Sequence, residues 1–236
     1  MRGSNKDTTS RETRLEAASA IGSAKKASLA FPLHRGKRNF SFRASGNKGR
    51  TSKDNERLYD LIDSKIVNVC YRVFEPSISL TQYVELNRFK LYLADTGLFT
   101  TMLFNAASDD HEDIYKKLLS RNLCTNQGYL YENAVSQMLV ASGRAPYYFT
   151  WPKKEGSPKH YEIDFLYGEL GKIIPLEVKS NRISSHESID KFKDRYSKIA
   201  GPRYLVSCKD YKKMGDLINI PFYELPFLLE GKRKIS

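Results

Sequence analysis

Residues 161–179 predict a β-hairpin, and this prediction restricts the fold more than any other part of the chain. Tyr161 to Leu166 is rich in aromatic and branched residues, Gly168 to Gly171 indicates a turn, and Ile173 to Val178 resumes the extended pattern. Pro175 has no backbone donor and is expected at an edge, a bulge or a strand start. The hairpin is therefore expected to be irregular near its second strand.

Three charged residues interrupt these apolar strands. Side chains alternate between faces along a strand, so Glu177 and Lys179 are expected on one face, roughly 6 to 7 Å apart along the backbone. The apolar residues beside them face the other way, into a core. Asp164 lies on the neighbouring strand. The pattern brings two carboxylates and an amine within reach of one another.

This combination suits phosphodiester hydrolysis. Such a reaction uses a hard cation to neutralise developing charge and to lower the pKa of the attacking water, and Mg²⁺ takes oxygen ligands from one or two carboxylates. Asp164 and Glu177 are the candidate ligands of Mg²⁺, or of Mn²⁺ in its place. Lys179 is the candidate for orienting the water or stabilising the transition state.

The flanking segments predict further elements of an α/β fold. Gly128 to Ala141 has helical periodicity, and Tyr147 to Phe149 is a short aromatic strand. Ser184 and Glu187 suggest a capping box that opens a second helix, and Tyr204 to Val206 is a further buried strand. The expected order is helix, three strands, helix, strand.

This order and these charges resemble the PD-(D/E)xK nuclease-like fold, which is the restriction-endonuclease-like core. The resemblance implies that Asp164, Glu177 and Lys179 correspond to the metal-binding acids and the lysine of that fold. It also implies that Glu132 corresponds to the glutamate of its first helix. Position 163 is isoleucine where the motif has proline, and only the aspartate after it could bind metal.

A wider resemblance covers the chain from about Arg35 onward. Four motifs in the same order resemble the C-terminal domain of a family of prokaryotic AAA-type ATPases, a domain catalogued as being of unknown function. The motifs are Phe89 to Leu98, Tyr131 to Asn133, Glu162 to Phe165 and Glu177 to Ser180. No P-loop motif occurs here, so the chain is not expected to hydrolyse ATP, and a separate ATPase subunit is a possible partner.

Positive charge is concentrated at the N-terminus. The net charge is +12, and residues 1–53 hold thirteen Lys and Arg against three Asp and Glu. Such an arm can bind nucleic-acid phosphates, or it can be a solvated leader. No apolar run approaches a membrane span, and three isolated cysteines (Cys70, Cys124 and Cys208) fit a reducing cytoplasm rather than a disulfide framework.

Three regions are expected. Residues 1–53 form a basic extension, residues 54–125 a linker and helical region with a strand at Val69–Phe74, and residues 126–236 the nuclease-like domain. By the resemblance, the part around residues 35–75 corresponds to a small winged-helix-like linker whose first portion is degenerate here. The chain is accordingly also read as a fragment or remnant of a longer ATPase.

Each candidate residue has a structural alternative. A Glu-Val-Lys strand is commonly a solvent-facing ion pair, and Glu132 is equally a surface residue of an amphipathic helix. Lys153, Lys154 and Arg182 are candidates for contacting a nucleic-acid backbone, although charge runs are usually solvated. The four histidines show no paired spacing and are read as structural or exposed, with His160 and His186 flanking the motif.

Two functions remain open from the sequence. The first is a Mg²⁺-dependent nuclease-like domain that acts on DNA phosphodiesters, with Asp164 and Glu177 binding metal. The second is a catalytically inactive module that binds DNA or a partner ATPase. A third interpretation, an aspartic protease with Asp95-Thr96-Gly97, lacks the second copy of the motif that such an enzyme requires.

Overall fold

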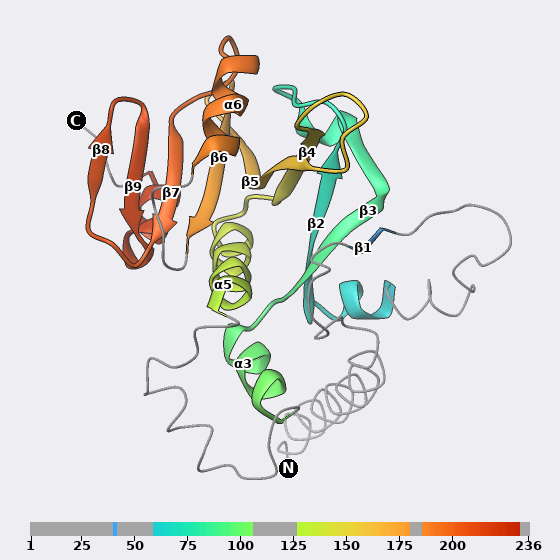
Figure 1. Ribbon diagram of the computed structural model, residues 1–236. Coiled ribbons are helices and arrows are strands. Elements are labelled where there is room, and N and C mark those ends of the chain that lie inside the picture. The colour runs from blue at the N-terminus through green and yellow to red at the C-terminus, as the bar shows by residue number, and fades with distance from the viewer. Residues whose placement is uncertain (1–39, 42–58, 106–126, 180–185, 232–236) are drawn as a thin grey trace, which may run out of the picture.

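The computed structural model describes residues 40–41, 59–105, 127–179 and 186–231, and these form a mixed α/β structure on one nine-stranded sheet (Figure 1). The strands are β1 (Phe40–Ser41), β2 (Val67–Val73), β3 (Val84–Leu93), β4 (Tyr147–Pro152), β5 (His160–Glu169), β6 (Lys172–Lys179), β7 (Arg203–Ser207), β8 (Lys212–Met214) and β9 (Leu217–Pro221). They lie in the order β1-β3-β2-β4-β5-β6-β7-β9-β8. The helices are α3 (Thr96–Asn105), α5 (Gln127–Ala141), α6 (Glu187–Arg195) and α7 (Leu225–Leu229), with 3₁₀ turns η1 (Leu80–Tyr83) and η2 (Phe222–Glu224).

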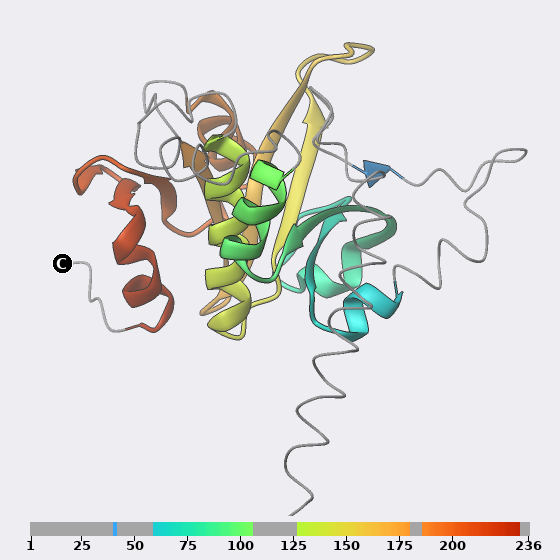
Figure 2. The same ribbon diagram turned by 90° about the horizontal axis from the view of Figure 1, so that it is seen from below.

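Helices cover the two faces of the sheet, and each face has its own core cluster (Figure 2). On what we call the α5 face, α5 and α7 pack on alternate strand residues that include Phe165, Leu176 and Val206. On the opposite α6 face, α6 packs on the residues between them, which include Ile163 and Leu205. Strands β4, β6, β7 and β9 are buried along most of their length, and they appear in the sequence as mostly apolar runs.

Strand β6 lies between an antiparallel neighbour and a parallel one. It pairs with β5 from Lys172 to Leu176 and with β7 from Leu176 to Lys179. The Ile173 N–H donates to the Ile199 carbonyl on the β7 side. Backbone N–H groups alternate in direction along a strand, so the backbone nitrogen of Pro175, two residues later, also points towards β7. Pro175 therefore occupies the gap between an isolated bridge at Ile173 and the regular β7 ladder, where a missing donor is tolerated. The β5–β6 hairpin itself keeps a regular register through Pro175, so the irregularity predicted for the hairpin is absent, and the interruption lies on the β7 side instead.

Strand β5 contains a β-bulge beside β4. Tyr147 pairs with Leu166 and Phe149 pairs with Ile163, so β5 uses one residue more than β4 over the same length. Ile163 packs in the α6-face cluster and Phe165 in the α5-face cluster. These two residues would share a face in a regular strand, and the bulge places them on opposite faces. Asp164 lies between them, at the bulge.

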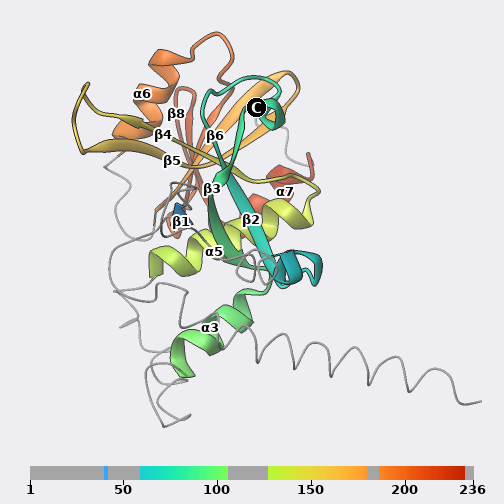
Figure 3. The ribbon, with the colours of Figure 1, turned by 90° about the vertical axis from the view of Figure 1, so that its right-hand side faces the viewer.

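Helix α5 passes beside the end of β3 (Figure 3), and its side chains hydrogen-bond to the turn that follows this strand. The Asn133 amide oxygen accepts the Leu93 N–H at 2.7 Å, and its amide nitrogen donates to the Leu93 carbonyl at 3.0 Å. Gln137 accepts hydrogen bonds from the backbone and hydroxyl of Thr96 at 3.1 and 2.7 Å. These bonds connect two of the motifs on which the family resemblance is based.

The Asp95-Thr96-Gly97 motif begins helix α3. Asp95 Oδ1 accepts the Leu98 N–H at 3.0 Å, which is the geometry of a helix N-cap. A Cβ atom at Gly97 would lie 3.0 Å from that same oxygen, so glycine leaves room for the cap. The motif thus has a structural role in which the aspartate is occupied by the helix.

The predicted α/β class is confirmed, and the segment from α5 to β7 has the predicted order of elements. Strands β2 and β3 join the same sheet as β4, so strands on both sides of the predicted boundary near residue 126 share one sheet. The predicted division into three regions stays a prediction, as most of residues 1–53 lie outside the described ranges. Ser184 also lies outside them, and His186 is the N-cap residue of α6.

Among the described residues, no helix is long and apolar enough to cross a membrane.

Candidate functional site

Two predicted site residues lie together at one end of β6. Strands β6, β7 and β9 are parallel, and their carboxyl ends meet at this edge, which is where open α/β sheets commonly bind ligands. Val178 packs in the α5-face cluster, so its neighbours Glu177 and Lys179 face α6. Lys179 Nζ lies 2.9 Å from Glu177 Oε2. The predicted same-face placement of the acid and the amine is present.

Glu177 is buried beside one ammonium, that of Lys179. Its residue surface is only 3% exposed. Oε2 forms the ion pair with Lys179, yet it accepts no well-aligned hydrogen bond from the part of the chain that the structure describes. Burial raises the pKa of Glu177 to about 7, the Lys179 ammonium lowers it, and the Asp164 carboxylate raises it further. This carboxylate is the kind that gains from a nearby cation.

Asp164 lies where β5 and β6 separate. The last paired residues at this end are Phe165 on β5 and Leu176 on β6. Asp164 and Glu177 are the next residue of each strand beyond this pair. Asp164 Oδ2 accepts the Val178 N–H at 2.9 Å, so the carboxylate is directed into the gap between the strands. Burial raises its pKa, while the Lys90 ammonium, this N–H group and Lys179 lower it. Charges on both faces of the sheet therefore shift the pKa of Asp164.

Glu132 occupies the other face. It lies on α5, is 6% exposed, and accepts a hydrogen bond from the Tyr92 hydroxyl at 3.1 Å. Burial, with Glu132 as the strongest neighbouring charge, raises the pKa of Tyr92 well above its ordinary value. Glu132 is thus directed towards β3, whereas Glu177 and Lys179 face α6. The structure does not bring all four predicted residues to one face.

Lys90 is a charged residue near the site that the sequence reasoning missed. It lies on β3, is 2% exposed, and pairs with Glu162 Oε1 at 2.7 Å. Burial alone would lower the pKa of Lys90, but the carboxylates of Glu162, Glu132 and Asp164 raise it above its ordinary value. A lysine inside the apolar strand segment 89–93 was the available signal. No sequence signal pairs Lys90 with Glu162, which lies 72 positions later in the chain.

The three predicted nucleic-acid contacts have different surroundings. Lys153 pairs with Glu187 at 2.9 Å and lies 4.5 Å from the centre of the Tyr161 ring, so its ammonium is already engaged. Lys154 is exposed in the loop between β4 and β5. Arg182 lies outside the described residues. The contacts stay predictions.

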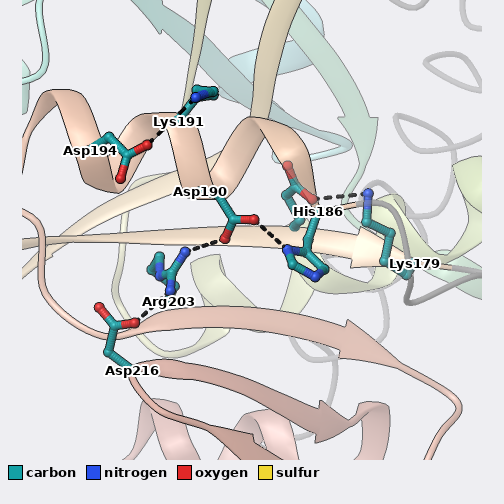
Figure 4. Close-up of polar contacts among 8 residues, drawn as sticks. Lys179, His186, Asp190, Lys191, Asp194, Arg203 and Asp216 are labelled. Atoms are coloured by element: carbon teal, nitrogen blue, oxygen red, sulfur yellow. Dashed lines mark hydrogen bonds and ion pairs between the residues drawn. The ribbon is translucent and has the colours of Figure 1, made fainter.

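His186 begins a chain of polar contacts next to the site (Figure 4). Its Nδ1 lies 2.6 Å from Asp190 Oδ2, and the other Asp190 oxygen accepts from Arg203. Arg203 NH2 donates to Asp216 at 2.5 Å. The sequence reasoning named His186 only as flanking the motif. The (i, i+4) spacing from His186 to Asp190 on a helix was the signal that could have found this pair.

The described residues can be compared with what a metal site needs. No group of three His, Cys, Asp or Glu side chains close enough to hold a metal ion occurs within these ranges. Mg²⁺ commonly takes one or two carboxylates and keeps several waters. Asp164 and Glu177 offer hard oxygen donors with raised pKa values, and the buried Oε2 of Glu177 contacts the Lys179 ammonium without a well-aligned hydrogen bond. This donor set fits a hard divalent cation.

The comparisons with known proteins leave the activity open. Residues 127–225 match a family model described as Domain of unknown function (DUF4143), a segment that includes Glu132, Asp164, Glu177 and Lys179. No curated protein matches the chain. A similar solved structure is that of protein VC1899 from Vibrio cholerae, at 14% identity over 94% of this chain, with a TM-score of 0.27. The chain spans 50% of that protein, and this low score assigns neither fold nor function.

Proposed function

We propose that this chain carries a metal-dependent nuclease-like domain, with a restriction-endonuclease-like core, that acts on DNA phosphodiesters. The observation that supports this proposal best is the buried Glu177 carboxylate. It has a raised pKa and an oxygen without a well-aligned hydrogen bond, and it lies beside Lys179 and within electrostatic reach of Asp164.

Asp164 and Glu177 would hold the cation, Mg²⁺ or Mn²⁺. When bound, the ion would neutralise charge on the phosphate and lower the pKa of a water. The two buried carboxylates supply negative charge that the protein alone compensates only in part. Lys179 is 23% exposed at its side chain, so its ammonium can reach both Glu177 and solvent. There it would hold the attacking water or stabilise the charge that develops on the phosphate oxygens.

A second function is favoured by the position of Glu132. Its hydrogen bond to Tyr92 keeps it on the α5 face, so the quartet implied by the family resemblance is incomplete on the α6 face. In this alternative the domain keeps the fold and binds DNA, or a separate ATPase subunit, without cutting. The two functions differ in whether a phosphodiester is broken.

A plasmid-nicking assay separates these functions. Supercoiled DNA is incubated with Mg²⁺ or Mn²⁺ and the wild-type protein, Lys179→Ala, Asp164→Asn or Lys172→Ala. Lys172 is the matched control, because it lies on the same strand with its ammonium bound to the Lys198 carbonyl at 2.8 Å. We expect the first two variants to lose about 100-fold or more in nicking rate and the control to keep it. Equal nicking by all four proteins would contradict the site. DNA binding without nicking by the wild type would favour the inactive module.

A further inference from the structure

The contacts of His186 extend the proposed site across three elements. His186 precedes α6 as its N-cap residue, Asp190 lies on α6, and Arg203 lies on β7. The Arg203 side chain is only 12% exposed and joins both Asp190 and Asp216. An ordinary surface pair on one helix would not include such a buried guanidinium. Asp190 thus holds the imidazole in position, and Arg203 in turn holds Asp190.

These bonds fix which part of the ring is available. Nδ1 contacts Asp190, whose carboxylate can only accept, so Nδ1 donates. Nε2 lies on the other side of the ring and has no hydrogen-bond partner among the described residues. The ring is half-buried, so solvent and ligands can reach it.

The ring lies next to the proposed site. Figure 4 places His186 near Lys179. Burial is the main cause of the raised pKa of Glu177, and the charge of His186 is among the influences that lower it. Lys179 and His186 therefore offer two nitrogen donors beside one buried carboxylate. Such an arrangement suits an anion that reaches the site from solvent, with a cation between it and the carboxylate.

We propose that His186 is a phosphate-binding residue of this site, positioned by Asp190. The form that binds is the imidazolium, in which both ring nitrogens donate: Nδ1–H stays on Asp190 and Nε2–H donates to a non-bridging oxygen of a DNA phosphate. The inference rests on the proposed function, since it takes DNA as the ligand. It adds a direct contact with the substrate backbone that lies outside the four residues of the nuclease motif. Asp190 acts through the ring and is a positioning residue.

DNA binding without cleavage tests this inference. A short fluorescein-labelled DNA duplex is titrated with protein in Ca²⁺, and its anisotropy is followed at several salt concentrations. His186→Ala is compared with His160→Ala, an exposed histidine on β5 whose Nδ1 faces the Pro158 carbonyl. We expect His186→Ala to weaken binding about tenfold and to reduce the salt slope by about 0.9, the value for one phosphate contact. We expect His160→Ala to bind as the wild type does.

The positioning role has its own matched pair. Asp190→Ala frees the imidazole, whereas Asp194→Ala removes an exposed carboxylate of the same helix that pairs only with Lys191, at 3.8 Å, among the described residues. We expect Asp190→Ala to weaken DNA binding by a smaller factor than His186→Ala and Asp194→Ala to leave it unchanged. Thermal melting of each variant checks that it is folded. His186→Gln, which keeps a donor without charge, is expected to recover part of the affinity.

The outcomes separate this inference from the proposed function. If the wild type nicks plasmid while His186→Ala binds the duplex normally, the inference is wrong and the proposed function survives. If the wild type does not nick but His186→Ala alone loses affinity, the phosphate contact survives without the nuclease. Equal losses in His186→Ala and His160→Ala, or no DNA binding by the wild type, would overturn the inference.

Discussion

The two faces of the sheet both carry buried charge near Asp164, and they handle it differently. On the α5 face Lys90 is 2% exposed and bound to Glu162, and Glu132 accepts a hydrogen bond from Tyr92. On the α6 face the Glu177 carboxylate pairs with the partly exposed Lys179 at 2.9 Å, and the oxygen that forms this pair has no well-aligned hydrogen bond. The first arrangement resembles a completed structural network, which stabilises only while all its members are present. The second leaves a demand for positive charge that a ligand can meet.

The largest expected effect comes from breaking the network of the α5 face. Lys90→Met removes the cation that Glu162 needs and leaves Asp164 and Glu132 with less compensation. We expect a loss of about 3 to 5 kcal/mol in the free energy of unfolding, the usual result of orphaning a buried charge. Urea denaturation measures it.

The equivalent change on the α6 face is expected to be mild. Lys179→Met removes the ammonium that pairs with Glu177. Because the pKa of Glu177 is already about 7, this carboxyl can take up a proton instead of staying charged. We expect a loss of about 1 kcal/mol at pH 7 by the same measurement. Equal losses at Lys90 and Lys179 would remove the contrast between the faces.

The second prediction concerns the pH dependence of stability. The folded pKa of Glu177, about 7, exceeds its ordinary value of 4.5, so the folded state binds more protons than the unfolded chain between these values. The contribution of Glu177 to the unfolding free energy therefore falls as pH rises through this window, by roughly 3 kcal/mol. In EDTA, Glu177→Gln should be more stable than the wild type at pH 8 and little changed at pH 4.5.

A matched control for this prediction is Glu187→Gln. The Glu187 carboxylate is exposed, and hydrogen bonds from Lys153 and Tyr161 lower its pKa. Its loss should give no gain in stability at pH 8. If Glu177→Gln and the wild type have parallel pH profiles, the carboxylate is not destabilised by burial.

A third, smaller effect probes the α5 face through one hydrogen bond. Tyr92→Phe removes the hydroxyl that donates to Glu132 and leaves the ring packing in place. We expect a loss of about 1 to 2 kcal/mol, since a buried carboxylate loses a donor. The plasmid-nicking rate should stay within a factor of about two of the wild type. A large fall in nicking with unchanged stability would move Glu132 into the active site.

The smallest effect is expected at the surface of α6. Lys191→Ala breaks an ion pair with Asp194 whose two side chains are 54% and 72% exposed. Such pairs contribute between about 0 and 1 kcal/mol, and they weaken further in salt. Thermal melting should hardly change. A loss comparable to that of Lys90→Met would mean that exposure does not determine the value of these pairs.

Local pattern predicted much of this structure. Aromatic and branched segments on either side of a turn predicted β5 and β6, and period-two alternation placed Glu177 and Lys179 on one face and Val178 on the other. Helical periodicity gave α5, with its observed end at Ala141. These features depend on residues a few positions apart, which is the range over which side-chain period carries information.

Contacts between distant segments could not be obtained in this way. The bulge that turns Asp164 into the gap depends on how β4 pairs with β5. The partner of Lys90 is set by the position of β3 in the sheet, and the turn of Glu132 towards Tyr92 by the docking of α5. A single sequence gives the candidate charges, and the tertiary arrangement decides which of them share a face.

Binding of Mn²⁺ to the metal-free protein tests the central claim most directly. Free Mn²⁺ is followed by its electron paramagnetic resonance signal in the wild type, Asp164→Asn, Glu177→Gln and Glu132→Gln. We predict one bound ion per wild-type chain, at least about tenfold weaker binding when either Asp164 or Glu177 is changed, and normal binding when Glu132 is changed. Unaltered binding by Asp164→Asn and Glu177→Gln would contradict a cation site between β5 and β6.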